Sequence, residues 1–353
     1  MNTDSPIDGE GSETSSGEPD TAGAVHGSAD AAPTVSVVIP TYDRPEMLVK
    51  AIRSVLDQTL SDVEIVVVDD GSPEAPTQVI DEFDDRIVFH RFEENRGANV
   101  ARSEGIKRSR GSYVAFLDDD DRWDEEKLER QVAALEANDA AGVCYTGQRL
   151  VSSDGETRRN TPSIAGDASK ALLTDRYLIT FSSLVVDRET IRKAGVPDPE
   201  LPNLQDREWL LRLARHAEFV SIEEPLLSRR VGGHGQITDR YERLRDFAYP
   251  YIYRKHRGFA TEFGWRYRFG FKASLLGWIG SLALYSGRYN EARRYLLASF
   301  VYWPFSTHVL VRLLVSLGGE KCHSIIKLLR DRYQTSRIPK LIRDWGHAER
   351  LSN

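Results

Sequence analysis

Hydrophobic positions from Val35 onward form short continuous runs that alternate with longer, more polar segments. The runs VSVVIP, VEIVVV, RIVFHRF and YVAFL contain few polar residues, which is typical of strands buried on both faces of a parallel sheet. The segments between them predict helices near 45–58, 75–83 and 97–109. We therefore predict an α/β fold in which a βαβ series builds a mostly parallel, Rossmann-like sheet.

Polar or small residues follow each predicted strand. Because the carboxyl ends of parallel strands meet at one edge of an open sheet, we expect these groups to line a common pocket. The four groups are 41–44, 69–72, 95–97 and 118–121.

Four consecutive carboxylates, Asp118 to Asp121, form the last of these groups. Carboxylates at this density repel one another unless a cation lies among them, so we expect Mn²⁺ or Mg²⁺ held by Asp120 with Asp118 nearby. The alternative is an acidic turn that caps the next helix, which suits Asp121 or Asp124 better than the whole run. The chain has no GxxxxGK[ST] or GxGxxG segment, so a metal is expected to hold the phosphates of a ligand.

The other strand ends suit a nucleotide. Asp70 can accept hydrogen bonds from a base or ribose, and Gly71 allows close backbone approach. Arg96 and Arg102 offer positive charge to phosphates or a carbonyl. For Asp43, a role in the site and a role as the N-cap of the following helix are equally good interpretations.

Charge divides the 353 residues into three parts. Residues 1–33 contain seven acidic residues and no Lys or Arg, and they are too poor in apolar side chains to fold, so we predict a disordered acidic tail. Residues 34–240 carry a net charge of -12, and residues 241–353 carry +12. The acidic front domain and the absence of a zinc or aromatic RNA-binding motif argue against nucleic acid as a partner. Cys144 and Cys322 match no metal-ligand spacing, and we expect a reducing, cytoplasmic setting.

Residues 241–353 hold 21 of the 33 aromatic residues and several helical patterns. Two uncharged stretches, Ala273 to Gly287 and Tyr295 to Val311, contain 15 and 17 residues, which is too short for a membrane span. We predict an α-helical region that lies peripherally on the inner face of the cell membrane, where basic and aromatic residues suit anionic headgroups. A soluble helical module with its aromatic residues in a core is the alternative.

Residues 35 to about 240 resemble a family 2 glycosyltransferase, the inverting, nucleotide-sugar-dependent class with a GT-A fold. The resemblance rests on four segments in order: VSVVIPTYDRPEMLVKAIRSVLDQTL, IVVVDDGSPE, NRGANVARSEGIKRSRGSYVAFLDDDDRW and QDREWLLRLAR. It implies a nucleotide-sugar donor. UDP is the nucleotide that we expect, and dTDP and GDP are the alternatives.

The resemblance also implies roles for individual residues. Asp118 and Asp120 become the DxD pair that holds the metal. Asp206 becomes the general base, although Gln205 stands where the family usually has Glu, so Glu208 is kept as a reserve. The implied contacts to the nucleoside are Thr41, Tyr42 and Asp70, with Arg96 or Arg102 near them.

A basic segment after this helix, Arg229 to Gln236, resembles a mobile segment of the family. His234 within it is expected to touch the diphosphate or metal, and a surface-loop histidine is the alternative of equal weight.

The implied reaction is a single displacement at the anomeric carbon by a hydroxyl that Asp206 deprotonates. The acceptor is expected to be a glycan or a polyprenyl-phosphate-linked intermediate of cell-surface glycan assembly. A phosphate acceptor is already anionic and would depend less on Asp206. The alternative from another class is a nucleotide-sugar-binding protein without catalysis.

Overall fold

The computed structural model describes residues 32–83, 87–152, 155, 157–174, 179–202, 204–231 and 241–332. All of them lie in one compact unit, Ala32–Asn353. The expected acidic tail falls almost entirely outside the described residues, and its disorder and the boundary near residue 240 stay predictions.

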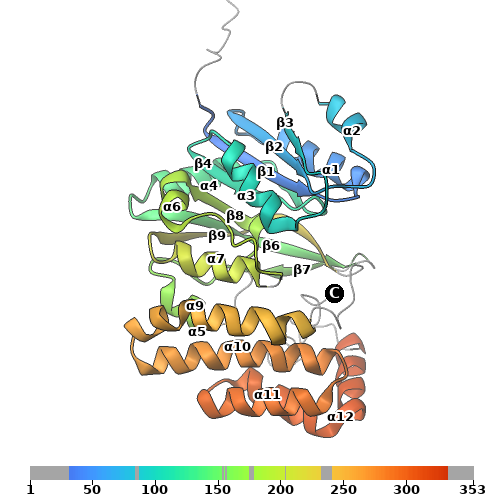
Figure 1. Ribbon diagram of the computed structural model, residues 1–353, viewed down its shortest axis with the longest axis vertical. Coiled ribbons are helices and arrows are strands. Elements are labelled where there is room, and N and C mark those ends of the chain that lie inside the picture. Colours follow the sequence, from blue (N-terminus) through green and yellow to red (C-terminus); the bar gives the residue numbers. More distant parts are fainter. Residues whose placement is uncertain are drawn as a thin grey trace, which may run out of the picture. The chain divides into compact units, whose positions relative to one another are not determined.

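A nine-stranded sheet forms the centre of this unit, in the order β3-β2-β1-β4-β8-β6-β9-β5, with β7 paired to β6 (Figure 1). Six strands, β1 to β4, β6 and β9, run in one direction, and β5, β7 and β8 run against them. The α/β class and the mostly parallel sheet are therefore confirmed. The strands are β1 (Val35–Thr41), β2 (Val63–Asp69), β3 (Ile87–Arg91), β4 (Tyr113–Phe116), β5 (Arg122–Trp123), β6 (Ala141–Ser152), β7 (Thr157–Asn160), β8 (Leu184–Asp187) and β9 (Glu218–Val231).

Helices cover both faces of β1, β2 and β4, as the continuous apolar runs predicted, whereas β3, at the edge of the sheet, has no buried residue. Val37 of β1 packs in one apolar cluster with Ile52 of α1, whereas the next residue, Val38, packs in a second cluster with Ala101 of α3. This alternation is the two-residue period of a strand with two buried faces. The helices of this part are α1 (Pro45–Leu56), α2 (Thr77–Asp81), α3 (Ala98–Arg108), α4 (Lys127–Glu136), α5 (Ser169–Thr174), α6 (Arg188–Ala194) and α7 (Gln205–Leu213).

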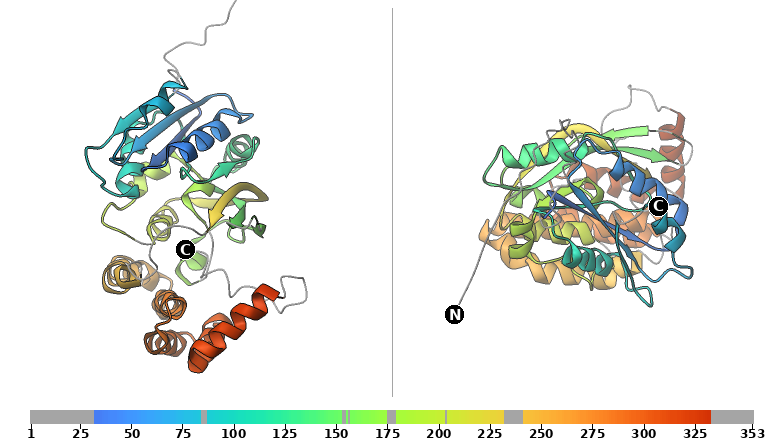
Figure 2. Two further views of the ribbon diagram at one scale, coloured as in Figure 1. Left: turned by 90° about the vertical axis from the view of Figure 1, so that its right-hand side faces the viewer. Right: turned by 90° about the horizontal axis from the view of Figure 1, so that it is seen from above.

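The remaining described residues are helical, which confirms the C-terminal helical region. A short π-helix (Leu244–Ala248) leads into α9 (Tyr249–Glu262), α10 (Trp265–Tyr285), α11 (Tyr289–Tyr302) and α12 (Thr307–Arg332), and Gly319 interrupts α12 with non-helical angles. Helix α10 contacts α5, α9 and α11, and the left view of Figure 2 shows α11 and α12, in orange and red, at the end of this stack. Within the described part of the chain, no helix combines the length and apolar character that a membrane crossing requires.

Candidate active site

The end of β2 forms a tight turn against the loop that precedes α3. The two carboxylate oxygens of Asp70 accept the backbone N–H groups of Arg96 and Gly97, at 2.8 and 2.9 Å. Gly71 has φ +77°, and a Cβ at this position would lie 2.4 Å from the carbonyl carbon of Glu94. Glycine is therefore required here by the loop itself, before any ligand is considered. Asp70 is buried, and burial raises its pKa in spite of the two hydrogen bonds.

The end of β1 offers one exposed aromatic ring beside this turn. Tyr42 is 43% exposed, whereas Thr41 is buried and its hydroxyl donates to Asp119 at 2.8 Å. The backbone N–H of Asp43 donates to the Ser72 hydroxyl at 2.9 Å, which ties the ends of β1 and β2 together. Arg96 lies over the Phe92 ring, 4.9 Å from its centre. Of the expected nucleoside contacts, Tyr42 and Arg96 are thus exposed, whereas Thr41, Asp70 and Arg102 are buried.

The four carboxylates after β4 differ in exposure. Side chains of Asp118 and Asp120 are 33% and 22% exposed, whereas Asp119 is 6% exposed and Asp121 is buried. Alternate residues therefore face outward, which is the pairing that a D-x-D spacing implies. Burial raises the pKa of Asp119, Asp120 and Asp121, and the neighbouring carboxylates, Asp118 among them, raise it further.

Two arginines offset part of this negative charge. Arg44 contacts Asp119 at 3.1 Å and Asp120 at 3.3 Å. Arg44 belongs to the group 41–44 that was expected to line the pocket, but no role was predicted for it. The positive charge of Arg229, on β9, lowers the pKa values of Asp120, Asp121 and Asp206 and so acts on all three carboxylates.

Arg102 is buried beneath the acidic run rather than exposed to solvent. Its guanidinium donates to Asp118 at 2.6 Å and to Gln205 at 3.3 Å, and it lies 4.0 Å from the centre of the Phe181 ring. Arg102 therefore links the first carboxylate of the run to the first residue of α7. Gln205 retains a carbonyl oxygen that accepts this bond, as a glutamate at the same position would.

Asp206 stands at the start of α7 beside this link. It is half-buried, and one carboxylate oxygen accepts the N–H of Arg207 at 2.8 Å. Burial raises its pKa, the charge of Asp118 adds to the rise, and hydrogen bonding together with Arg229 and Arg102 opposes it. A carboxylate with a raised pKa and some access to solvent is suited to general-base catalysis.

Glu208, the reserve base, has no exposed surface. Its carboxylate contacts Arg212 and Lys255 at 2.9 Å each and His256 at 3.1 Å. Burial alone would raise its pKa, but the hydrogen bonds from His256, Arg212 and Lys255 outweigh burial and lower the pKa to about 2. Glu208 therefore holds α7 against α9 and is inaccessible to an acceptor.

Arg207, the residue directly after Asp206, also anchors α7. Its guanidinium donates to the Ser274 hydroxyl of α10 at 2.6 Å and to the carbonyl of Leu173 at 3.3 Å. The two residues that follow Asp206, Arg207 and Glu208, thus bind α10 and α9, which fixes the first turn of α7 that carries Asp206.

No group of three or more His, Cys, Asp or Glu side chains around one point is present among the residues that the structure describes. His234 belongs to 232–240, outside those residues, and its expected role stays a prediction. Asp118 and Asp120, the outward pair, stay the predicted ligands of a cation among the described residues. Mg²⁺ characteristically binds through one or two carboxylates together with substrate phosphates, so this pair fits a cation that arrives with a diphosphate.

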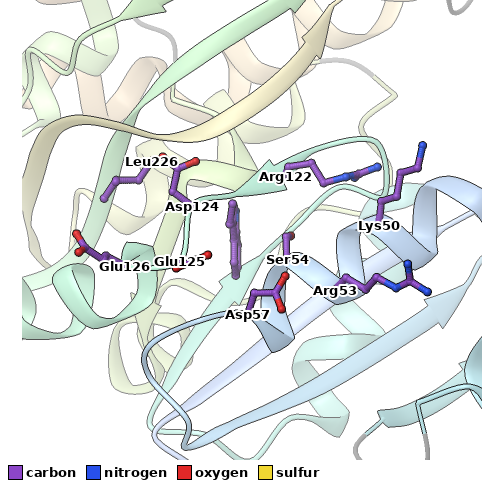
Figure 3. A pocket seen from close by; sticks show the side chains of 10 residues that line it. Lys50, Arg53, Ser54, Asp57, Arg122, Asp124, Glu125, Glu126 and Leu226 are labelled. Atoms are coloured by element: carbon purple, nitrogen blue, oxygen red, sulfur yellow. The ribbon is translucent and has the colours of Figure 1, made fainter.

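A hollow of 630 Å³ lies on the outer side of the acidic turn (Figure 3). Arg122 lines it and donates to the backbone carbonyl of Asp119 at 3.4 Å. Figure 3 shows Lys50, Arg53 and Arg122 on one side and Asp124 and Glu126 on the other. None of the expected site residues lines this hollow.

Comparison with known proteins finds similarity to glycosyltransferases. The family model described as glycosyl transferase family 2 matches residues 36–188. The chain is 28% identical over 233 residues to a putative teichuronic acid biosynthesis glycosyltransferase of Bacillus subtilis, covering 64% of this chain and 90% of that protein. It is also 28% identical over 225 residues to an uncharacterized glycosyltransferase of Methanocaldococcus jannaschii, covering 62% of this chain and 77% of the relative.

Solved structures resemble the fold at low sequence identity. Residues 1–349 of S. aureus TarS match with a TM-score of 0.52 and 16% identity, over 80% of this chain and 88% of that fragment. A mannosyltransferase from Pyrobaculum calidifontis, solved with GDP-Man and Mn²⁺, matches with a TM-score of 0.53 and 14% identity, over 92% of this chain and 85% of that one. At these identities the likeness concerns the fold.

Proposed function

This chain is a family 2 glycosyltransferase with a GT-A fold, and we propose that it moves a sugar from a nucleotide-sugar donor to a hydroxyl or phosphate acceptor with inversion at the anomeric carbon. The observation that carries this proposal is the link from Asp118 through Arg102 to Gln205, because it joins the outward carboxylate pair to the helix that bears Asp206. A single displacement needs groups that hold the donor and a base that deprotonates the acceptor. In this proposal Asp118 and Asp120 hold the donor and Asp206 is the base.

UDP is the proposed nucleotide, held by the ends of β1 and β2. TarS has been solved with UDP and with UDP-GlcNAc, which supports a uridine nucleotide, whereas the mannosyltransferase with GDP-Man keeps GDP open. Tyr42 is accessible for contact with the base, and Asp70 and Arg96 form the neighbouring wall. Each carboxylate oxygen of Asp70 already accepts one backbone N–H and retains a further acceptor site for the base or ribose.

Mn²⁺ or Mg²⁺ is the proposed cofactor, with Asp118 and Asp120 as its protein ligands. When bound, such an ion neutralises the charge of a diphosphate and makes it a better leaving group. Arg44 contacts Asp120 at 3.3 Å and offers a positive charge at the same place.

Asp206 is the proposed general base for a hydroxyl acceptor. Its carboxylate takes the hydroxyl proton while the oxygen attacks the anomeric carbon from the face opposite the nucleotide. Arg207 and Glu208 hold α7 in place during this step through their contacts with α10 and α9. Arg229, near both the carboxylate run and Asp206, supplies positive charge as negative charge develops on the diphosphate.

We further propose a lipid-linked acceptor and a location on the inner face of the cell membrane. The net charge of +12 in residues 241–353 favours an anionic surface. The Bacillus relative is named for the synthesis of teichuronic acid, which supports a cell-surface glycan as the product.

Two substitutions separate catalysis from donor binding. Asp206→Asn is expected to bind donor as the unaltered protein does and to transfer sugar to a hydroxyl acceptor about 10²- to 10⁴-fold more slowly. Asp120→Ala is expected to lose metal-dependent donor binding. Calorimetric titration with UDP, GDP and dTDP, each with and without Mn²⁺, measures the binding, and product analysis measures the transfer.

The results also test the alternative, a nucleotide-sugar-binding protein without catalysis. Such a protein would leave the donor intact in the presence of metal and acceptor. Normal transfer by Asp206→Asn to a hydroxyl acceptor would show that another group is the base.

A further inference from the structure

The last helices of the described chain expose apolar side chains where polar ones are expected. Leu297 and Val301 of α11 are 53% and 72% exposed, and Leu314 and Leu317 of α12 are 57% and 61% exposed. Phe305, in the turn between the two helices, is 74% exposed. These residues recur at intervals of three and four, so each helix presents an apolar stripe on its outer side.

This exposure is concentrated in one part of the chain. Eleven large apolar residues are exposed in the part that the structure describes, and eight of them lie between 265 and 317. A scattered exposed Leu or Val is ordinary, but a concentration of this kind marks an interaction surface.

Aromatic side chains extend the surface to the start of α10. Phe269 of α10, 39% exposed, lies 5.8 Å from the Tyr302 ring at the end of α11, measured between ring centres. Trp265 lies 5.8 Å from Phe269, and Trp303 lies 5.7 Å from Phe305. The start of α10 and the α11–α12 turn therefore form one aromatic corner. Trp and Tyr are the residues enriched where protein meets the headgroup level of a bilayer.

Positive charge surrounds the same surface. Residues 263–319 contain seven Arg or Lys, of which Arg312 is buried, and one acidic residue, Glu291. Glu291 is not free, because it binds Tyr241, Arg245 and Arg288. Lys272 donates to the Tyr302 hydroxyl at 2.7 Å, so basic groups reach the aromatic corner itself.

We propose that α11, the α11–α12 turn and the part of α12 before Gly319 lie in the plane of an anionic bilayer, with Leu297, Val301, Phe305 and Leu314 inserted among the acyl chains. The inference rests on the proposed membrane location and names the surface that makes the contact. Apolar stripes supply the insertion, and the cations bind the headgroups. A symmetric dimer through this face would bring two basic surfaces together, which like-charge repulsion opposes.

Vesicle binding of the full chain tests the proposal. The variants are Val301→Glu combined with Phe305→Glu, and Leu314→Glu separately. The matched control is Val88→Glu, a 36% exposed apolar residue of β3 outside this surface. Each protein is sedimented with vesicles of phosphatidylcholine alone and with vesicles that contain 30% phosphatidylserine. UDP titration and circular dichroism of every variant verify that it is folded.

We expect the unaltered chain and Val88→Glu to bind the anionic vesicles and the double variant to bind at least about 100-fold more weakly, since two exposed apolar side chains no longer enter the bilayer. Binding of the double variant at the level of the unaltered chain would overturn this inference and leave the membrane location standing. Failure of the unaltered chain to bind would overturn both, whereas the transfer reaction is tested separately with a soluble acceptor. Light scattering that finds a dimer of the unaltered chain and a monomer of the double variant, without vesicle binding, would assign the surface to a second copy and also overturn the proposal.

Discussion

Replacing Glu208 with glutamine is expected to destabilise the fold by about 3 kcal/mol, because a buried carboxylate with three basic partners loses its charge. Glutamine retains nearly the same shape, so the change isolates the charge from the packing. Lys255 would keep an ion pair with Asp198, 2.5 Å away, and Arg212 would keep its bond to the carbonyl of Val196 at 2.9 Å. The loss is therefore expected at the lower end of the range of about 3 to 5 kcal/mol known for broken buried pairs.

The pKa of Glu208 gives an independent estimate of the same size. The difference between the ordinary value of 4.5 and the folded value of about 2 corresponds to about 3 kcal/mol. A carboxylate whose pKa is lowered by folding stabilises the protein above its unfolded pKa. This contribution is fully present above about pH 4.5 and is lost as the pH falls toward 2.

Urea unfolding followed by tryptophan fluorescence measures the effect for the unaltered chain and Glu208→Gln at several pH values. We expect a constant difference in unfolding free energy between pH 8 and 6 and a smaller difference below about pH 4.5. Glu189→Gln is the matched control. Glu189 also has a pKa lowered to about 2, by its hydrogen bond from Arg192, but it is exposed and should contribute little. Equal unfolding midpoints for Glu208→Gln and the unaltered chain at pH 7 would refute the reasoning.

Three further substitutions test the site and its support. Gly71→Ala places a Cβ 2.4 Å from the Glu94 carbonyl carbon at φ +77°, so we expect a loss of about 1 to 3 kcal/mol in urea unfolding, and unchanged stability would contradict the turn geometry. Arg102→Met removes the 2.6 Å bond to Asp118 and should weaken Mn²⁺-dependent UDP binding at least about 10-fold by calorimetry, whereas an unchanged affinity would mean that Asp118 needs no such support. Lys127 is fully buried, and burial lowers its pKa to about 7. Between about pH 7 and 10.5 the unfolded chain binds a proton at Lys127 that the folded chain does not, so Lys127→Met should raise the free energy of unfolding, by more at pH 6.5 than at pH 9. A stabilisation that grows with pH in urea unfolding would contradict this reasoning.

The order of strands along the chain could be read from the sequence, but their order in the sheet could not. Continuous apolar runs predicted β1, β2 and β4 because strands buried on both faces admit few polar residues, and β3 was predicted from the same pattern although none of its residues is buried. The expected helix near 75–83 is shorter in the structure, where α2 spans Thr77–Asp81. Strand β8 enters the sheet between β4 and β6 and runs against both, and no local pattern in its four residues signals this neighbourhood.

The residue types of the site were predictable, and their individual roles depended on packing. Asp118 and Asp120 face outward from a turn that the hydrogen bond from the Asp121 N–H to the Asp118 carbonyl closes at 3.0 Å, so their exposure depends on this turn. Arg102 was expected near the nucleotide and instead lies buried between Asp118 and Gln205, 16 and 103 residues away in the sequence.

The sequence by itself determined the α/β class, the resemblance to family 2 glycosyltransferases and the carboxylates after β4, because these depend on local apolar runs and on residues close together in the chain. Only the tertiary structure distinguished Asp206 from Glu208, two residues apart on one helix. One is half-buried beside the acidic run, and the other is enclosed by Lys255 and His256 from α9. Burial and charge depend on which distant segments surround a side chain, and that is decided by the packing of the whole chain.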